Sequence, residues 1–92
     1  MIVKEDILDN NIIKLIQSSD YKERLQGEYF ELLTRRNALA NMLYKYTRGT
    51  LDFTPNTPIE LLKAQLHIME SYLSILDYRI QIFECPDKWS SE

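Results

Sequence analysis

Residue types that build catalytic and metal sites are scarce in this sequence. Its 92 residues contain one cysteine, one histidine and two glycines. The lone Cys85 cannot form an intramolecular disulfide or complete a zinc site within one chain. Two glycines are too few for a glycine-rich phosphate loop, and Ser71 and Ser74 have only His67, one turn away, as a nearby base. We therefore expect a protein that is not an enzyme, with no catalytic residue, no metal site and no cofactor.

Long apolar runs and a surplus of basic residues are also missing. No run approaches the roughly 20 apolar residues that a membrane-spanning helix needs. Residues 1–6 include acids where a signal peptide needs bases and an apolar core. Eleven bases against fourteen acids give a net charge of −3, which disfavours duplex nucleic acid as a partner. We expect a cytoplasmic protein that binds neither membranes nor duplex nucleic acid.

Capping residues mark the ends of a first long helix. Asp20, followed three residues later by Glu23, is a typical N-cap, because its side-chain oxygen can accept from the free amides of the first turn. Residues 21–48 contain no proline, and Gly49 can take the left-handed conformation that closes a helix. Gly27 is the only weak position, since glycine destabilises a helix interior by about 1 kcal/mol relative to alanine.

A second helix start is marked by the run Thr57-Pro-Ile-Glu60. It places a capping residue, a first-turn proline and a returning glutamate in the expected order. The helix should end near Glu84, because Pro86 disfavours helical geometry at the residue before it. The expected organisation is a single domain, 1–92, with an N-terminal segment (1–19), a first helix (20–49), a connector (50–57), a second helix (58–84) and a tail (85–92).

Apolar residues recur at alternating steps of four and three along both expected helices, which is the spacing of a coiled-coil seam. Each helix carries two such stripes side by side. In the second helix they are Leu62, Leu66, Met69, Leu73, Leu76, Ile80 and Phe83, beside Leu61, Gln65, Ile68, Tyr72, Ile75, Arg79 and Ile82. In the first helix they are Leu25, Tyr29, Leu32, Arg36, Leu39, Leu43 and Tyr46, beside Phe30, Leu33, Asn37, Ala40 and Tyr44.

The doubled stripes determine the expected fold class. Two long helices joined by a short polar connector predict an all-α, antiparallel, coiled-coil-like hairpin. Such a hairpin can cover only one stripe of each helix, so the second stripes predict a homo-oligomer. A short N-terminal helix that folds back over one stripe is the competing explanation, and both can hold together. Its apolar residues would be Ile7, Leu8, Ile12, Ile13, Leu15 and Ile16.

A basic window interrupts the otherwise acidic chain. Residues 32–51 contain four bases and no acid, with tyrosines among the bases. Guanidinium groups bind phosphates and aromatic rings stack on bases, so this window favours an anionic aromatic ligand. The alternative is a basic helix end favoured by the helix dipole, with core tyrosines. The candidate ligand-binding residues are Arg35, Arg36, Tyr44, Lys45, Tyr46, Arg48 and, beyond the connector, Lys63.

Two arginines occupy positions within apolar stripes. Arg36 lies between Leu32 and Leu39, where an unpaired buried charge would cost several kcal/mol. Either an acid such as Glu70 on the facing helix pairs with it, or it lines a cavity that holds an anion. Arg79 in the other helix poses the same question, and both point to polar pockets at helix interfaces.

The runs Tyr21-Lys-Glu-Arg-Leu-Gln-Gly-Glu-Tyr-Phe-Glu-Leu32, Leu61-Leu-Lys-Ala-Gln-Leu-His-Ile-Met-Glu-Ser-Tyr-Leu73 and Leu76-Asp-Tyr-Arg-Ile80 carry a resemblance to a known family. Over about residues 20–83 the chain resembles the crAss-phage-related small helical proteins, which phages and prophages encode. The resemblance implies a viral origin and no settled activity. The chain is also similar, in architecture and not in motif, to phage anti-defence proteins that sequester a signalling nucleotide between subunits.

Two functions from different classes follow as expectations. In the first, a phage anti-defence protein binds and sequesters a signalling nucleotide, of the cyclic oligonucleotide or cyclic ADP-ribose type, without cleaving it. In the alternative, the chain is a protein–protein interaction module that inhibits or adapts a host protein through its apolar helical face. The expected partners are therefore a second copy of the chain and a small anionic nucleotide, or a host protein in the alternative.

Overall fold

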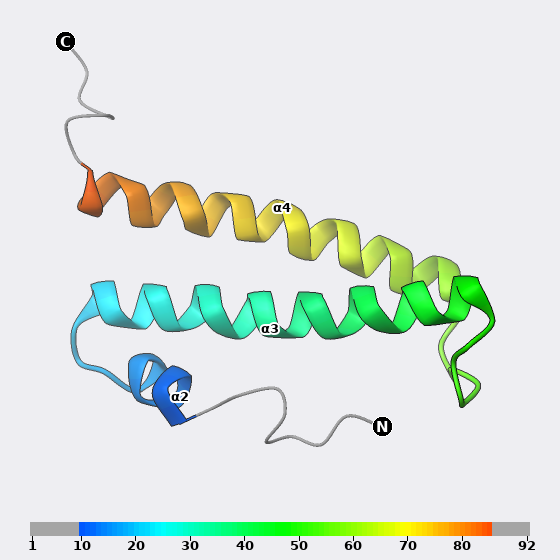
Figure 1. Cartoon of the computed structure of the whole chain (residues 1–92). Helices are drawn as coiled ribbons and strands as arrows, with labels where there is room; N and C mark the ends of the chain where they lie inside the picture. The colour runs from blue at the N-terminus through cyan, green and yellow to red at the C-terminus, as the bar shows by residue number, and fades with distance from the viewer. Residues whose placement is uncertain (1–9, 86–92) are drawn as a thin grey trace, which may run out of the picture.

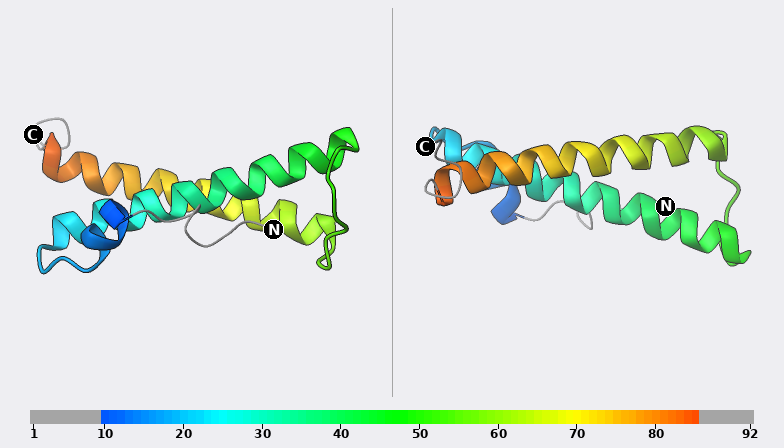
Figure 2. Two further views of the ribbon diagram at one scale, coloured as in Figure 1. Left: turned by 60° about the horizontal axis from the view of Figure 1, so that its bottom comes forward. Right: turned by 90° about the horizontal axis from the view of Figure 1, so that it is seen from above.

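The computed structural model describes residues 10–85, which form three helices (Figure 1). They are α2 (Asn10–Ile16), α3 (Tyr21–Arg48) and α4 (Ile59–Glu84). The two long helices run antiparallel and pack against each other, and the views from other directions show that they cross at a shallow angle (Figure 2). The expected all-helical hairpin is thus present in the described part of the chain, which contains no strand.

The ends of α3 agree with the expected caps. Asp20 has an extended backbone, and its carboxylate accepts from the Lys22 backbone amide at 3.0 Å. The Ser18 hydroxyl accepts from the Asp20 amide and donates to the Glu23 carboxylate, so Glu23 supports the cap through Ser18. At the other end, Gly49 has a φ of +73°, the left-handed conformation that closes a helix without steric cost.

The start of α4 differs from the expectation. Pro58, with φ −57° and ψ 137°, takes the position before the first helical residue, so the helix begins at Ile59. Thr57 does not cap it, and its hydroxyl donates to the Asn56 side-chain oxygen at 3.4 Å. The reason is local, because a proline holds the residue before it in extended conformation, away from the first turn. The end of α4 at Glu84 is as expected.

The core of the hairpin is thin. Among the described residues, the buried hydrophobic side chains are Leu25, Leu43 and Leu76. All three belong to the first of the two stripes described for each helix, and only Leu76 is fully inaccessible, with 0% exposure. The neighbouring stripe of α4 remains open, since Ile68 is 70% exposed. The surplus apolar surface predicted from the two-stripe pattern is therefore present on α4.

Helix α2 covers part of the first long helix and does not contact α4 (Figure 1). A Cβ atom placed on Gly27 would lie 2.7 Å from the Ile16 backbone nitrogen and 2.9 Å from the Leu15 Cβ. Gly27 is therefore the point where the backbone of α2 approaches α3, a role that its low helix propensity did not reveal. The expected N-terminal helix is confirmed over residues 10–16, and its proposed members Ile7 and Leu8 lie outside the described residues.

We expect the substitution Gly27→Ala to destabilise the protein. Overpacking typically costs about 1–3 kcal/mol, which exceeds the roughly 1 kcal/mol that alanine gains in helix propensity. A net loss of about 1 kcal/mol in the free energy of unfolding should appear in a urea titration followed by circular dichroism. Amide exchange in residues 10–16 should accelerate, because the contact between α2 and α3 loosens.

The matched control is Gly49→Ala, which strains a left-handed residue that has no heavy atom within 4 Å of an added Cβ. This variant should lose stability without faster exchange in α2. A Gly27→Ala protein that is more stable than the parent would show that α2 does not pack on α3 in solution.

Candidate functional site

The candidate ligand-binding residues do not gather at one place in a single chain. Arg35 and Tyr46 line two adjoining hollows at the connector end of the hairpin. Tyr44 and Arg48 contact each other, and Lys63 pairs with Glu60 on α4. The last two candidates lie apart from these groups. Arg36 is in the seam between the long helices, and Lys45 is on the exposed surface of α3.

The larger hollow has a volume of about 530 Å³ and lies between the second half of α3, residues 53–57 of the connector and the first half of α4. Its lining is mostly apolar and includes Met42 from α3 and Met69 from α4. Phe53 adds an aromatic ring that is 45% exposed. Asn56 and Gln65 add amide groups, which both donate and accept hydrogen bonds. Such a mostly apolar hollow with a few polar groups is typical of a small-molecule site.

Arg35 supplies the cation of the larger hollow. One of its terminal nitrogens lies 3.2 Å from a carboxylate oxygen of Glu31, one turn earlier on α3. The Arg35 side chain is 50% exposed, and such surface pairs contribute about 0–1 kcal/mol. The pair therefore orients the guanidinium without holding it strongly, and its remaining N–H groups can bind an anion in the hollow.

The smaller hollow, of about 200 Å³, adjoins the larger one across the connector. Phe53, Thr54 and Pro55 line both, and Tyr46 lines only the smaller hollow. The ring of Tyr46 is 46% exposed, so an aromatic face is available on this side of the connector. Arg35 and Tyr46 are thus the two candidates that the fold brings to one continuous surface.

Tyr44 and Arg48 lie on another flank of α3. The guanidinium carbon of Arg48 is 5.5 Å from the centre of the Tyr44 ring, and its Nη1 donates to the Tyr44 hydroxyl at 3.2 Å. Nine residues separate Arg35 from Tyr44, which places them about 180° apart around an α-helix. These two groups therefore cannot bind one ligand within the same chain.

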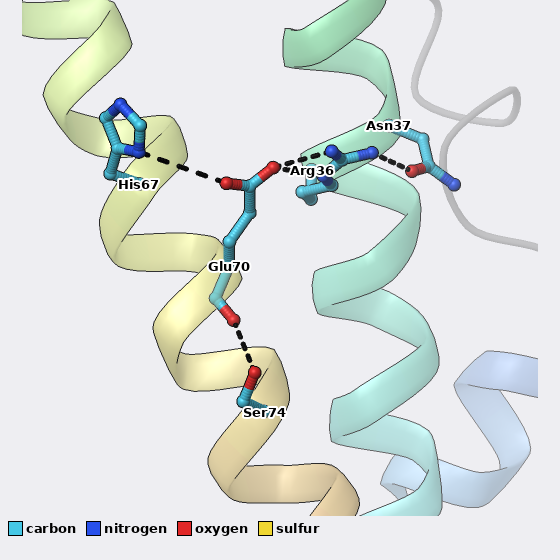
Figure 3. A network of polar contacts seen from close by, with 5 residues as sticks. All are labelled: Arg36, Asn37, His67, Glu70 and Ser74. Carbon is cyan, nitrogen blue, oxygen red and sulfur yellow. Dashed lines mark hydrogen bonds and ion pairs between the residues drawn. The ribbon is translucent and has the colours of Figure 1, made fainter.

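Arg36 on α3 forms an ion pair with Glu70 on α4 (Figure 3). Its Nε and Nη2 atoms donate to the same carboxylate oxygen of Glu70, at 3.1 and 2.6 Å. Its Nη1 donates to the side-chain oxygen of Asn37 at 3.0 Å, and the second Glu70 oxygen lies 4.0 Å from Nδ1 of His67. Of the two explanations offered for this arginine in an apolar stripe, the ion pair with Glu70 is confirmed.

Arg79 lies at the opposite end of the hairpin. With Tyr21, Leu25, Ile82 and Phe83 it lines a hollow of about 200 Å³. Within the described part of the chain its guanidinium has no hydrogen-bond or ion-pair partner. Unlike Arg36, this second stripe arginine therefore stays available to a ligand or to another chain.

The lining residues Phe53, Asn56 and Gln65 were not among the sequence candidates. The basic window predicted ligand-binding residues from their charge. The lining of the hollow depends instead on the path of the connector between the helices. The sequence signal for Phe53 and Asn56 was an aromatic residue and an amide in a proline-containing connector, whereas Gln65 stood out only as a polar member of an apolar stripe in the second helix. Within residues 10–85 no three His, Cys, Asp or Glu side chains lie close enough to hold a metal, and no helix is long and apolar enough to cross a membrane.

The Arg36–Glu70 pair predicts a measurable contribution to stability. We expect Glu70→Gln to lower the free energy of unfolding by about 1 kcal/mol, because charge-assisted hydrogen bonds between partly buried groups contribute more than surface pairs. The matched control is Glu60→Gln, which breaks the 3.6 Å pair with Lys63, where Glu60 is 88% exposed. Its effect should be about 0.2 kcal/mol. Equal losses in chemical denaturation would contradict a structural role for Arg36.

Comparison with known proteins gives one match. Residues 19–82, more than half of the chain and nearly the whole hairpin, match the Sequestin family. No curated protein and no solved structure matches. The family name fits a role in sequestering a molecule and implies binding rather than catalysis. The similarity to the crAss-phage-related proteins stays a prediction. On the strength of a match that includes both long helices, the chain belongs to the Sequestin family.

Proposed function

We propose that this protein binds and sequesters a signalling nucleotide, of the cyclic oligonucleotide or cyclic ADP-ribose type, without cleaving it. It would act as a phage anti-defence protein in the cytoplasm of an infected bacterium. The observation that carries the proposal is the hollow of about 530 Å³, whose mostly apolar lining includes Arg35, Phe53 and the amide side chains of Asn56 and Gln65. Its volume lies within the range of about 300–1,000 Å³ typical of small-molecule sites.

Each lining group matches one part of a nucleotide. The guanidinium of Arg35 can donate two parallel hydrogen bonds to phosphate oxygens. The exposed ring of Phe53, or that of Tyr46 across the connector, can stack on a base, a contact that contributes about 1–3 kcal/mol. The amides of Asn56 and Gln65 can pair with the donors and acceptors of a base edge. Together these groups are complementary to an anionic aromatic ligand.

The arrangement favours holding the ligand over converting it. The chain's single histidine, His67, has an 81% exposed side chain on α4 and lies outside the hollow. None of the lining residues is an acid, a cysteine or a histidine. General base catalysis needs such a group within hydrogen-bond reach of the reacting atom. The ligand would therefore be removed from solution intact.

The remaining candidates require a second copy of the chain. Tyr44, Lys45, Arg48 and Lys63 lie outside the two connector hollows. We include a homo-oligomer in the proposal, because the exposed stripe of α4 is an unburied apolar face. A neighbouring copy could bring these groups toward a ligand that one chain holds through Arg35.

A host protein is the second candidate partner, and the same exposed face of α4 favours it. Ile68 and Ile75 are 70% and 54% exposed, as expected for residues that insert into a partner's groove. In this alternative, Ile68→Asp would abolish capture of one stoichiometric host protein, and free nucleotides would not bind.

Thermal denaturation in the presence of cyclic ADP-ribose and of cyclic di-AMP tests the proposed function. A ligand at 100 times its Kd should add about 2.7 kcal/mol to the free energy of unfolding. Arg35→Gln should weaken binding about tenfold, the typical effect of losing a charge-assisted bond. Mass spectrometry of the supernatant after heating should recover the nucleotide with unchanged mass.

Lys14→Gln is the matched control, because it removes the same charge from α2, which lines neither connector hollow. Binding that falls equally in both variants would place the ligand outside the hollow. Recovery of a cleaved product, or stability unaffected by any signalling nucleotide, would overturn sequestration.

A further inference from the structure

The exposed stripe of α4 is self-complementary. It consists of Leu61, Gln65, Ile68, Tyr72, Ile75, Arg79 and Ile82, and all seven side chains are exposed. The pattern is symmetric about its central residue, Tyr72. Its polar members, Gln65 and Arg79, lie seven residues to either side of that centre. The apolar members are symmetric about the same centre to within one residue.

We propose that a second copy of this chain docks antiparallel along this stripe, with the two-fold axis at Tyr72, and that its Arg79 completes the larger hollow. In this register Ile68 faces Ile75 of the second copy, and Leu61 faces Ile82. Each Gln65 faces an Arg79, whose guanidinium donates to the amide oxygen. Every apolar residue of the stripe then contacts an apolar residue of the second copy, and Gln65 and Arg79 hydrogen-bond to each other across the interface.

The symmetry argues for a second copy over an unrelated partner. An isologous interface requires that each residue and its symmetry mate be compatible, which this stripe achieves along its whole length of about 31 Å. A groove for a foreign helix has no reason to place its two polar residues at equal distances from the centre. The Tyr72 hydroxyl donates to the Glu28 carboxylate of its own chain, so burial of the ring at the axis leaves no unpaired hydroxyl.

The same register places the Arg79 guanidinium of the second copy beside the larger hollow. Gln65 lines the larger hollow together with Arg35, so an arginine that faces Gln65 lies at the edge of that hollow. Arg79 has no ion-pair or hydrogen-bond partner among residues 10–85, which leaves its guanidinium available. Each hollow then holds Arg35 from one chain and Arg79 from the other, and the dimer has two equivalent sites.

This composite site narrows the ligand class and rests in that respect on the proposed function. Two guanidinium groups from opposite sides favour a nucleotide with two phosphates, as in a cyclic dinucleotide or a pyrophosphate-bridged cyclic nucleotide. A nucleoside monophosphate would engage only one of them. The placement of Arg79 does not depend on any ligand and can be tested separately.

Disulfide trapping tests the register in a Cys85→Ser background, which removes the natural cysteine. Tyr72→Cys should link to itself across the axis and give a species of twice the 11.0 kDa chain mass on a non-reducing gel. A chain that carries both Gln65→Cys and Arg79→Cys should also form a linked dimer. The control is Ser74→Cys, two residues from the centre but off the stripe, which should remain monomeric on the gel.

Ligand binding tests the contribution of Arg79. Arg79→Gln should weaken binding of cyclic di-AMP or cyclic ADP-ribose about tenfold and leave the dimer intact in light scattering. Lys22→Gln, which removes a charge at the same end of the hairpin, should bind like the parent protein. Its ammonium lies over the Phe83 ring, 5.4 Å from the centroid, outside the larger hollow.

The outcomes separate the two proposals. A monomer of 11.0 kDa in light scattering at tens of micromolar, or Ser74→Cys linking as readily as Tyr72→Cys, would overturn the docked second copy. Trapped dimers in which Arg79→Gln binds like the parent would overturn the role of Arg79. Dimers trapped through Tyr72→Cys, which lies outside the larger hollow, that bind no nucleotide would support the interface and overturn the proposed function alone.

Discussion

A pair of packed helices can bury one stripe of each helix and no more, and this geometric constraint governs the molecule. Leu25, Leu43 and Leu76 are the buried hydrophobic residues among those described, so the contact between α3 and α4 is a small source of stability. Small single cores are marginal in general and need an additional element. The chain adds α2 against α3, at the glycine that permits close approach, and leaves α4 with an open apolar stripe.

The same constraint accounts for the position of the proposed ligand site. A hollow between two helices is shallow unless a third element walls it, and the connector provides this wall through Phe53 and Pro55. A second copy on the α4 stripe would enclose the hollow further and displace water from its edge. Lower local polarity strengthens the hydrogen bonds between guanidinium groups and phosphate, so the proposed oligomerisation and anion binding would reinforce each other.

The sequence predicted the features that depend on local spacing. Asp20 and Gly49 were identifiable as caps because their roles follow from backbone chemistry within one turn, and the Arg36–Glu70 pair was one of two explanations for a charge in an apolar stripe. Non-local features escaped prediction. Gly27 could be read only as a weak helix residue until α2 was placed against it. Likewise, the contributions of Phe53 and Gln65 to one hollow depend on the path of the connector.

A protein that removes a signal without destroying it acts by mass action, so its affinity and its number of sites set its capacity. With the proposed composite sites, one ligand would be bound per chain, and each site would exist only in the assembled dimer. Ligand binding and dimerisation are then thermodynamically linked, because a ligand that binds only the dimer stabilises it and dilution of the chain weakens apparent affinity. A high concentration of the chain would thus have two effects: it would raise the number of sites and increase the fraction of chains in the dimer. The thin core of the single hairpin fits such a design, in which the interface that completes the fold also completes the site.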